Sequence, residues 1–295
     1  MMMIDSDSPN KTNQVQKRRH PLRWVAALLI LLAVGWCFLQ WQLWGIQVTV
    51  TQVGVHGLPD GFEGLRIVQI SDLHGHEYGQ DSEALLALVA QQAPEFIVVT
   101  GDLIDQESHL AMVPALARGL AAIAPTYYVT GNHEWAVGGV PRLKGILTEC
   151  GVTVLSNQYV TLERNGDSLV LAGVDDPNGY ADQKTPEELY GEIQREAGDL
   201  CTILLAHRNE YYGVYSDGGF DVTLCGHVHG GIIRLPFTDG LIDNTRRRFF
   251  PSYTAGLYPL ESGGTLMVSR GLGNGGMAFR LFNRPHLPVI VLRSE

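Results

Sequence analysis

Short apolar runs alternate with amphipathic stretches along most of this chain. In the first half they predict strands over residues 65–70, 95–100 and 126–130, and helices over 82–92, 110–123 and 140–150. The second half is richer in strand patterns, at 152–155, 159–163, 169–173, 202–206, 221–224, 265–268 and 288–292, with one further helix over 186–197. Residues 47–55 alternate loosely and fit either a first strand or a linker. We therefore expect an α/β sandwich in which helices flank two mixed β-sheets.

The first 46 residues have a different pattern. They carry five basic and two acidic side chains, and residues 1–20 are polar enough to predict a disordered tail. Residues 24–46 then form a run of 23 uncharged positions, long enough for a hydrocarbon core that requires roughly 20 residues. Trp24, Trp41 and Trp44 lie near its ends, as is typical of membrane interfaces. The pattern predicts a cytoplasmic tail over 1–20, a transmembrane anchor over 22–46 and a folded domain over 47–295.

Three alternatives to an anchor fit the apolar segment less well. A cleaved signal peptide needs a shorter apolar region followed by small residues, which the sequence of residues 40–44, Gln-Trp-Gln-Leu-Trp, does not supply. A lipoprotein signal needs a small residue before its cysteine, but Trp36 precedes Cys37. A buried helix of a soluble protein leaves the basic flank unexplained. The positive-inside rule predicts a single-pass protein of the inner membrane with its N-terminus in the cytoplasm and its folded domain outside.

The charge of the remaining 249 residues limits the partners of the folded domain. They contain 16 basic and 29 acidic side chains, a net charge of −13, so no nucleic acid is expected as a partner and a nuclease is disfavoured. No protein partner is predicted. An acidic domain that binds phosphate needs a source of positive charge other than its own side chains, and bound metal ions would supply it. Cys150, Cys201 and Cys225 lie in apolar settings and are interpreted as buried thiols.

Polar residues follow three of the early strands at intervals of thirty residues. Asp72 comes after the strand at 65–70, Asp102 after the strand at 95–100 and Asn132 after the strand at 126–130. Because successive parallel strands end at the same edge of a sheet, we expect these side chains to meet there. His74, two residues after Asp72, is expected to face the same way on extended chain.

Histidines repeat this arrangement after later strands. His207 follows the strand at 202–206, and His227 and His229 follow the strand at 221–224. Glycines precede Asp102, Asn132 and His227 and are expected to let the backbone approach a ligand closely. Oxygen and imidazole donors together suit Mn²⁺, Fe or Zn²⁺ better than Ca²⁺, and two divalent ions would leave the site positive enough for a phosphate.

The ordered motifs Asp72-x-His74, Gly101-Asp-x-x-Asp105, Gly131-Asn-His-Glu134, His207 and Gly226-His-x-His229 resemble those of the calcineurin-like metallophosphoesterases, over roughly residues 65–230. Further pieces are similar to a membrane-linked bacterial branch of phosphodiesterases that includes hydrolases of UDP-2,3-diacylglucosamine: Gly230-Gly231, Ala255-Gly-Leu-Tyr258, Ser269-Arg-Gly-Leu-Gly273 and Arg284-Pro285.

The resemblance implies a role for each motif residue. The ligands of a first metal would be Asp72, His74, Asp102 and His229. Asp102 would bridge to a second metal, whose other ligands would be Asn132, His207 and His227. His133 would protonate the leaving oxygen, oriented by Asp105, and a hydroxide bridging the two metals would attack phosphorus. Glu134 is expected to support the loop of His133.

Basic residues outside the motifs are candidates for substrate binding. Seven arginines lie between residues 234 and 284, and Arg234 and Arg270 are the candidates for a phosphate clamp, against the alternative of a solvated face. The isolated His20, His56, His109 and His286 are interpreted as surface groups.

The pattern as a whole favours a phosphodiesterase or pyrophosphatase acting on a lipid-linked or nucleotide phosphoester. The first alternative is a phosphomonoesterase or protein phosphatase, which the resemblance makes less favourable because Gln106-Glu107 replace the Arg-Gly common in that branch. The second is a non-catalytic metal-binding scaffold, which predicts lost ligands, and none is lost. The expected location of the domain outside the cytoplasm conflicts with a UDP-lipid substrate, which is cytoplasmic.

Overall fold

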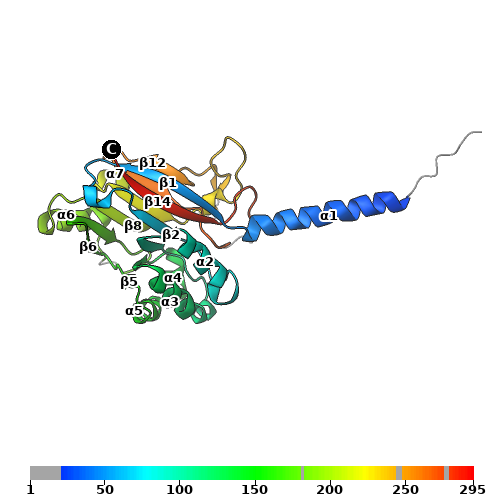
Figure 1. The fold of residues 1–295 in the computed structure, drawn as a ribbon, viewed down its shortest axis with the longest axis horizontal. Coiled ribbons are helices and arrows are strands. Elements are labelled where there is room, and N and C mark those ends of the chain that lie inside the picture. Colours follow the sequence, from blue (N-terminus) through cyan, green and yellow to red (C-terminus); the bar gives the residue numbers. More distant parts are fainter. Residues whose placement is uncertain (1–20, 181–182, 244–247, 276–278) are drawn as a thin grey trace, which may run out of the picture. The chain divides into compact units, whose positions relative to one another are not determined.

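The structure, a computed structural model, describes residues 21–180, 183–243, 248–275 and 279–295. The predicted tail over residues 1–20, which includes His20, lies outside the described residues, as do Arg246 and Arg247. The chain divides into two units, Met1–Leu39 and Gln40–Glu295. The described part of the first unit belongs to a single helix, α1, which spans Pro21–Trp44 (Figure 1). All other elements belong to the second unit, which we call the body.

The body begins with a strand, alternates strands with helices up to α5, and is richer in strands after it. Its helices are α2 (Glu83–Gln91), α3 (Val113–Ile123), α4 (Asn132–Val137), α5 (Val140–Glu149), α6 (Pro186–Glu196) and α7 (Tyr212–Asp217). Its strands are β1 (Gln47–Val55), β2 (Arg66–Ile70), β3 (Phe96–Thr100), β4 (Thr126–Val129), β5 (Thr153–Val154), β6 (Gln158–Arg164), β7 (Asp167–Gly173), β8 (Thr202–Arg208), β9 (Val222–Gly226), β10 (Ile242–Asp243), β11 (Arg248–Phe249), β12 (Gly256–Pro259), β13 (Thr265–Val268) and β14 (His286–Ser294).

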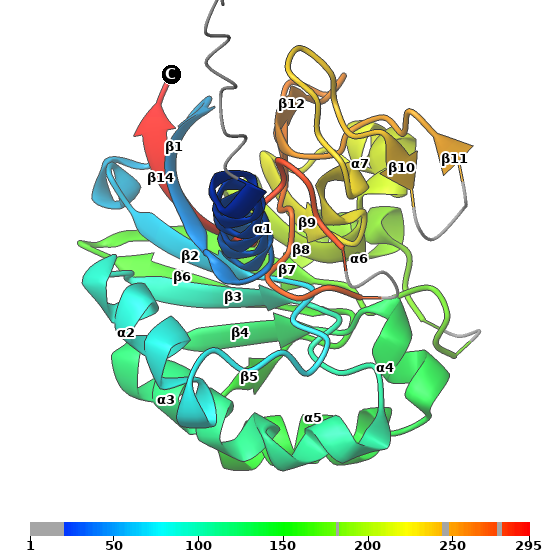
Figure 2. The same ribbon diagram turned by 90° about the vertical axis from the view of Figure 1, so that its right-hand side faces the viewer.

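Two six-stranded mixed sheets form the body, which confirms the predicted fold class (Figure 2). The first sheet has the order β1-β14-β2-β3-β4-β5, with β2 to β5 parallel and β14 antiparallel to β2. The second has the order β12-β13-β9-β8-β7-β6, parallel at its centre and antiparallel at both edges. The carboxyl ends of the parallel strands in each sheet therefore share an edge.

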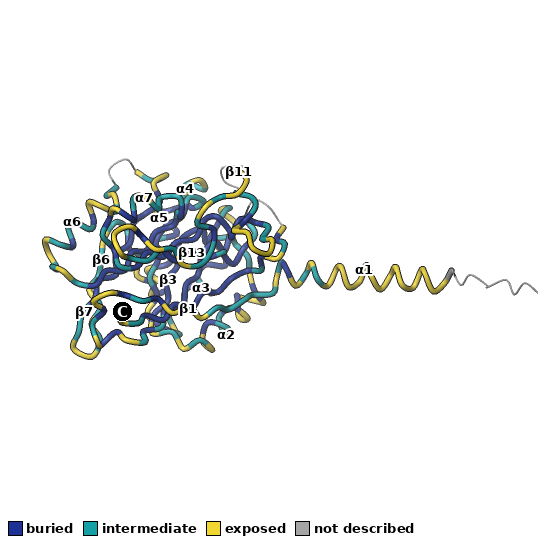
Figure 3. Tube along the Cα trace, turned by 90° about the horizontal axis from the view of Figure 1, so that it is seen from above, coloured by how far each residue is buried: buried dark blue, intermediate teal, exposed yellow. Residues whose placement is uncertain are grey.

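Alternating side chains on the central strands build three apolar layers. Ile67 and Val98 face the second sheet and pack in the layer between the sheets with Leu171 and Leu205. Val68 and its neighbours on the other face pack against α2, α3 and α5, and the outer face of the second sheet packs against α6 and α7. The central strands, among them β2, β3, β8 and β9, are buried along most of their length (Figure 3). Because these layers hold the strands, their carboxyl ends form a firm base for polar side chains.

The structure decides between the two interpretations of residues 47–55 and adds short elements that the sequence did not predict. Residues 47–55 are a strand, β1, paired with β14 along all nine residues, and so are not a linker. The helices α4 and α7 and the strands β10, β11 and β12 have no apolar period long enough to predict them. Thr185 caps α6, because its hydroxyl accepts from the backbone N–H of Glu188 and the Glu188 carboxylate accepts from the backbone N–H of Thr185.

The helix α1 matches the apolar segment of the sequence. Within the described residues, Leu22–Trp44 is the one helix long and apolar enough to cross a membrane, with a mean hydropathy of 2.2. Length and composition are the whole of this indication, and a signal sequence near an N-terminus passes the same test.

Candidate metal centre

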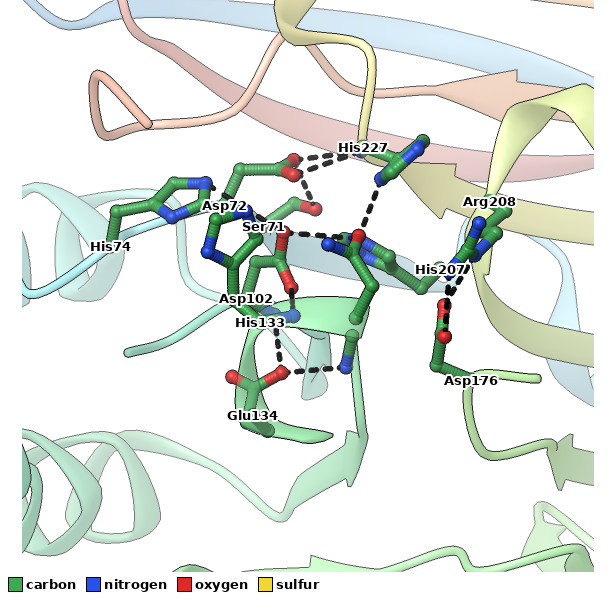
Figure 4. A network of polar contacts seen from close by, with 12 residues as sticks. Ser71, Asp72, His74, Asp102, His133, Glu134, Asp176, His207, Arg208 and His227 are labelled. Atoms are coloured by element: carbon green, nitrogen blue, oxygen red, sulfur yellow. Dashed lines mark hydrogen bonds and ion pairs between the residues drawn. The ribbon is translucent and has the colours of Figure 1, made fainter. Parts of the chain in front are cut away.

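The polar residues that follow the strands meet at one place in the body (Figure 4). Asp72 and Asp102 follow the neighbouring parallel strands β2 and β3 of the first sheet. His207 belongs to β8 and His227 follows β9, the neighbouring parallel strands of the second sheet. Asp72 and Asp102 therefore lie at a common edge of the first sheet, as their thirty-residue spacing predicted. His207 and His227 of the second sheet face them.

One group of potential metal ligands consists of Asp72, His74 and His229. Their ligand atoms lie within 4.8 Å of one another, and all three side chains are buried. The Nε2 atoms of His74 and His229 are 3.0 Å apart, and Nε2 of His229 is 3.8 Å from Oδ1 of Asp72. Neighbouring ligands of one cation are spaced like this, because each lies about 2.0–2.2 Å from the ion.

A second group consists of Asp102, His207 and His227, again within 4.8 Å of one another and buried. Nε2 of His207 is 3.0 Å from Nδ1 of His227 and 3.2 Å from Oδ2 of Asp102. The amide oxygen of Asn132, at the start of α4, is 3.1 Å from the same nitrogen of His207. Four donors from both sheets thus converge on one point.

Asp102 lies between the two groups. Its Oδ2 atom is 3.2 Å from His207 in the second group and 3.7 Å from Nε2 of His74 in the first. Its Oδ1 atom accepts a hydrogen bond from the backbone N–H of His133 at 2.9 Å. A carboxylate in this position can contact cations on both sides.

The backbone of the site differs from the extended chain that we expected after β2. Asp72 and His74 have φ values of 51° and 50°, and Asp102, His227 and His229 have φ values of 52°, 77° and 49°. These five residues therefore lie in left-handed turns, which cost about 1–2 kcal/mol per non-glycine residue. The expectation that Asp72 and His74 face the same way is confirmed, since both belong to one ligand group, but the extended backbone from which it was reasoned is wrong. The turns themselves aim both side chains inward, and strained turns of this kind cluster at functional sites.

Two of the expected glycines are required by close contacts. A side chain at Gly226 would collide with Oγ of Ser71 and Oδ2 of Asp72, and a side chain at Gly131 would collide with the carboxylate of Asp102. The backbone therefore comes within contact distance of the ligands at both places, as the motifs predicted.

The side chain of Glu134 links the loop after β4 to the loop after β3. Its buried carboxylate accepts hydrogen bonds from the backbone N–H groups of Gly131 at 2.7 Å, Asp102 at 3.0 Å and Leu103 at 2.5 Å. Burial, with the nearby charge of Asp102, raises the pKa of Glu134 to about 8, while the N–H donors oppose this rise because they bind the charged form. The expectation that Glu134 supports the loop of His133 is confirmed.

The electrostatics of the site favour the binding of cations. Burial lowers the pKa of His74 to about 3 and holds the pKa values of His227 and His229 well below their usual range, so these rings are neutral and keep lone pairs for a ligand. Burial acts to raise the pKa of Asp102, but His207 outweighs it and keeps that pKa well below its usual value. Although burial acts to lower it, Asp102 raises the pKa of His207 to about 10. A divalent cation can replace the proton that this pair shares, so the residues present fit a metal centre.

Two neighbours of the ligands were not singled out from the sequence. Oε2 of Glu210 is 3.5 Å from Nε2 of His227, on the far side of the ring from His207. Arg280 is 1% exposed, and its Nη2 atom is 3.2 Å from Nδ1 of His229 and donates to the carbonyl of Gly273 at 2.6 Å. In the sequence, only the seven arginines between residues 234 and 284 pointed to Arg280, and no pattern pointed to Glu210.

The proposed acid and its partner are not joined. The His133 ring lies edge-on to His74, with 4.7 Å between ring centroids, and is partly exposed. Asp105 places Oδ1 2.9 Å from Nδ1 of His109 and Oδ2 3.8 Å from Nδ1 of His74. Within the described residues no hydrogen bond links Asp105 to His133, so the expected orienting contact is replaced by one with His109, which is not an isolated surface group.

The other histidines and arginines that the sequence analysis named agree with its expectations only in part. His56 is exposed as expected, but His286 is only 5% exposed and pairs with Thr49. Arg234 donates to the hydroxyl of Thr254, and Arg270 donates to the side chain of Gln47. Within the described residues neither guanidinium forms a hydrogen bond or ion pair with the ligand groups, so their role as a phosphate clamp stays a prediction.

Known proteins share this arrangement of motifs. The family model for the calcineurin-like phosphoesterases matches residues 65–231. The metallophosphoesterase YkuE of Bacillus subtilis is 33% identical over 246 residues, which cover 80% of this chain and 82% of that protein. Phosphodiesterase YaeI of Escherichia coli is 30% identical over 60% of this chain and 65% of its own length. A transmembrane protein with a metallophosphoesterase domain from Bos taurus is 29% identical over 84% of this chain but only 57% of its own length. The ligand groups, their order along the chain and these relatives together show that the chain belongs to the calcineurin-like phosphoesterase family and is a phosphoric ester hydrolase.

Proposed function

We propose that this protein is a membrane-anchored phosphodiesterase or pyrophosphatase that works with two divalent ions, Mn²⁺, Fe or Zn²⁺. The observation that carries the proposal is the pair of buried ligand groups, with Asp102 in the second group and 3.7 Å from His74 of the first. A single ion would need only one of these groups, whereas two ions side by side suit the attack of water on a phosphoester.

Each ion has a set of ligands in this proposal. Asp72, His74, Asp102 and His229 hold the first, and Asp102, Asn132, His207 and His227 hold the second. When bound, the two ions supply Lewis acidity at the phosphate and lower the pKa of a water molecule to near neutrality.

The chain's own residues supply the proton and the orientation. His133 is the proposed donor of a proton to the leaving oxygen, because its ring is partly exposed beside the buried ligands. One of its nitrogens lies within 4.8 Å of ligand atoms of His74 and Asp102, so the proposed acid is close to the ions that these two residues would hold. Asp105 is proposed to orient the ring of His74, whose Nδ1 atom lies 3.8 Å from it.

A cavity of about 370 Å³ beside His207 supports a diester or pyrophosphate over a simple monoester. Its walls include Tyr180, Tyr211 and the guanidinium of Arg208, which Asp176 holds through two hydrogen bonds of 2.6 and 2.9 Å. The second substituent of a diester, whether lipid-linked or nucleotide, needs room near the metal centre. Of the proposed ligands, His207 alone lines this cavity among the described residues, and we propose that the cavity receives that substituent.

The anchor is α1. Its length and hydropathy, together with the transmembrane relative from Bos taurus, support a single pass through the inner membrane. The basic residues before the helix favour a cytoplasmic N-terminus and a body outside the cytoplasm. Tags at each terminus and protease treatment of intact cells test this orientation: protection of a C-terminal tag would reverse it.

The reaction is tested on the full chain purified in detergent. We expect close to two ions per chain by elemental analysis and faster hydrolysis of bis-p-nitrophenyl phosphate than of p-nitrophenyl phosphate with Mn²⁺. Asp102→Ala should lose metal and activity, while the exposed Asp60→Ala should keep both. His133→Ala should keep its metal and lose turnover by ~10²–10⁴, against His56→Ala as the control.

Each outcome has a consequence for the proposal. A preference for the monoester would make the protein a phosphomonoesterase. A protein that is loaded with metal but inert on both substrates would be a scaffold. Full metal content in Asp102→Ala would refute the shared ligand.

A further inference from the structure

Two loops near the metal centre expose more apolar surface than a soluble protein normally shows. Phe237 is 107% exposed, Phe249 74%, Phe250 72% and Phe282 55%, and Leu235 is also exposed. We call these five residues the apolar rim. Loops at a protein surface are usually polar, and a concentration of exposed large apolar side chains marks a surface that binds another apolar phase.

Backbone hydrogen bonds hold the segments of the rim side by side. The N–H of Arg234 donates to the carbonyl of Leu281 at 3.0 Å, and the N–H of Leu241 donates to Ile233 at 2.9 Å. The N–H of Phe250 in turn donates to Leu241 at 2.9 Å, and β10 pairs with β11 (Figure 2). The phenylalanines are therefore neighbours in one part of the body and not scattered over it.

The rim continues to the point where the chain leaves its apolar helix. The guanidinium of Arg284, two residues after Phe282, lies 4.3 Å from the ring centroid of Trp41. It also donates to the carbonyls of Gly45 at 2.8 Å and Ile46 at 2.9 Å. Trp41 and Trp44 are each about half exposed. Tryptophan and arginine side by side, next to exposed phenylalanine, are typical of protein surfaces at the level of lipid headgroups.

The same loops hold a candidate metal ligand. The side-chain amide of Asn283 donates to the carbonyl of His229 at 2.7 Å, and the N–H of Ile232 donates to the same carbonyl at 3.3 Å. Arg280 reaches the ring of His229 from the second loop. A surface that seats these loops would therefore lie beside the metal centre.

We infer that the apolar rim is a lipid-docking surface, through which the body itself rests on a bilayer. Phe237, Phe249, Phe250 and Phe282 enter the boundary between headgroups and acyl chains, and the exposed Arg248, next to Phe249, meets the lipid phosphates. The protruding loops suit a fluid interface better than a second protein, because protein interfaces need a closely packed, complementary face. This contact goes beyond the anchor α1, since it belongs to the body, and it does not depend on the proposed reaction.

The test uses the full chain in nanodiscs of phosphatidylethanolamine and phosphatidylglycerol. Cys37→Ser removes the exposed thiol, and the other three cysteines are buried. Phe237→Cys then carries an environment-sensitive nitrobenzoxadiazole label. The matched control places the same label at His56→Cys, an exposed site at the far end of β1, about 27–30 Å along the strand from residue 47.

We expect the label at position 237 to shift its emission to the blue. We also expect it to lose intensity by about twofold or more when the disc contains phosphatidylcholine with a doxyl quencher near the carbonyl end of the acyl chain, a depth that interfacial segments reach. The label at position 56 should respond to neither. Equal emission and quenching at both positions would overturn the inference. So would energy transfer between labels at position 237 on two copies without quenching, because a second copy would then cover the rim.

The outcome is independent of catalysis. Quenching with an inert protein would support the docking surface and count against the proposed function. Hydrolysis without quenching would do the reverse.

Discussion

Glu134 offers the sharpest test of how the metal loops are held. Its carboxylate is fully buried and accepts its three shorter hydrogen bonds from the backbone N–H groups of Gly131, Asp102 and Leu103. A fourth and longer one, of 3.4 Å, comes from Ile104 and is weaker. In Glu134→Ala the three closer donors lose their partner without gaining water. A buried donor left unsatisfied costs about 1–3 kcal/mol, so the free energy of unfolding should fall by about 3–9 kcal/mol. This is a large part of the 5–15 kcal/mol that stabilises a typical domain.

Glu134→Gln should lose about half as much. Oε2 accepts from Gly131 and Asp102, and Oε1 accepts from Leu103, so an amide can keep only one side of this arrangement. Its NH₂ group must then face N–H donors on the other side. The intermediate result separates hydrogen bonding from the simple loss of volume, because glutamine has nearly the size of glutamate.

The assay is the thermal midpoint of the full chain in detergent, followed by scanning fluorimetry. For a domain of this size about 1 kcal/mol shifts the midpoint by about 2–4 °C, so Glu134→Ala should melt at least ~6 °C lower. Glu149→Ala, at an exposed position of α5, should stay within about 0.5 kcal/mol of the parent protein. A midpoint for Glu134→Ala equal to that of Glu149→Ala would show that the three N–H groups do not depend on this carboxylate.

Three further predictions concern the metal centre. Gly226→Ala should lower turnover by ~10²-fold, because its new methyl group displaces Ser71 and the neighbouring ligand Asp72. Gly145→Ala on α5, where a methyl group meets open space, should leave turnover unchanged. Equal turnover in the two variants would contradict this reasoning. Glu210→Gln should weaken metal binding by ~10–100-fold in calorimetric titrations, since the carboxylate faces Nε2 of His227, and an unchanged affinity would remove it from the site. Metal removal with EDTA should lower the thermal midpoint by about 10–20 °C, reversibly with Mn²⁺. Each of the two ions, present at about 100 times its dissociation constant, stabilises the folded state by about 2.7 kcal/mol. An unchanged midpoint would mean that no ion was bound.

Much of the candidate site was predictable because its residues follow strands with clear apolar patterns. Asp72 and Asp102 could be placed at one sheet edge from their thirty-residue spacing, and their strands β2 and β3 are indeed parallel neighbours. The local geometry was not predictable in the same way. A strand pattern ends where its apolar residues end, and it does not show that the next residues turn left-handed, as His74 and His229 do.

The contacts around the ligands also escaped prediction. Arg280 lies 51 residues from His229 in the sequence, and Glu210 is 17 residues from His227, in segments without a regular apolar period. The proposed pairing of Asp105 with His133 failed for the same reason: sequence order places both near the site, but the short turn after Asp105 brings His109 to its carboxylate instead.

The sequence by itself determined the central strands, the helices with long apolar periods, the apolar helix α1 and the candidate metal-binding side chains, because these depend on neighbours only a few residues away. The tertiary structure alone decided that β1 pairs with β14 from the other end of the chain, and that the second sheet brings His207 and His227 up to Asp102. It also decided that the phenylalanines of the apolar rim lie together. Such long-range contacts form only when whole layers bury their apolar faces against one another, so no local pattern records them.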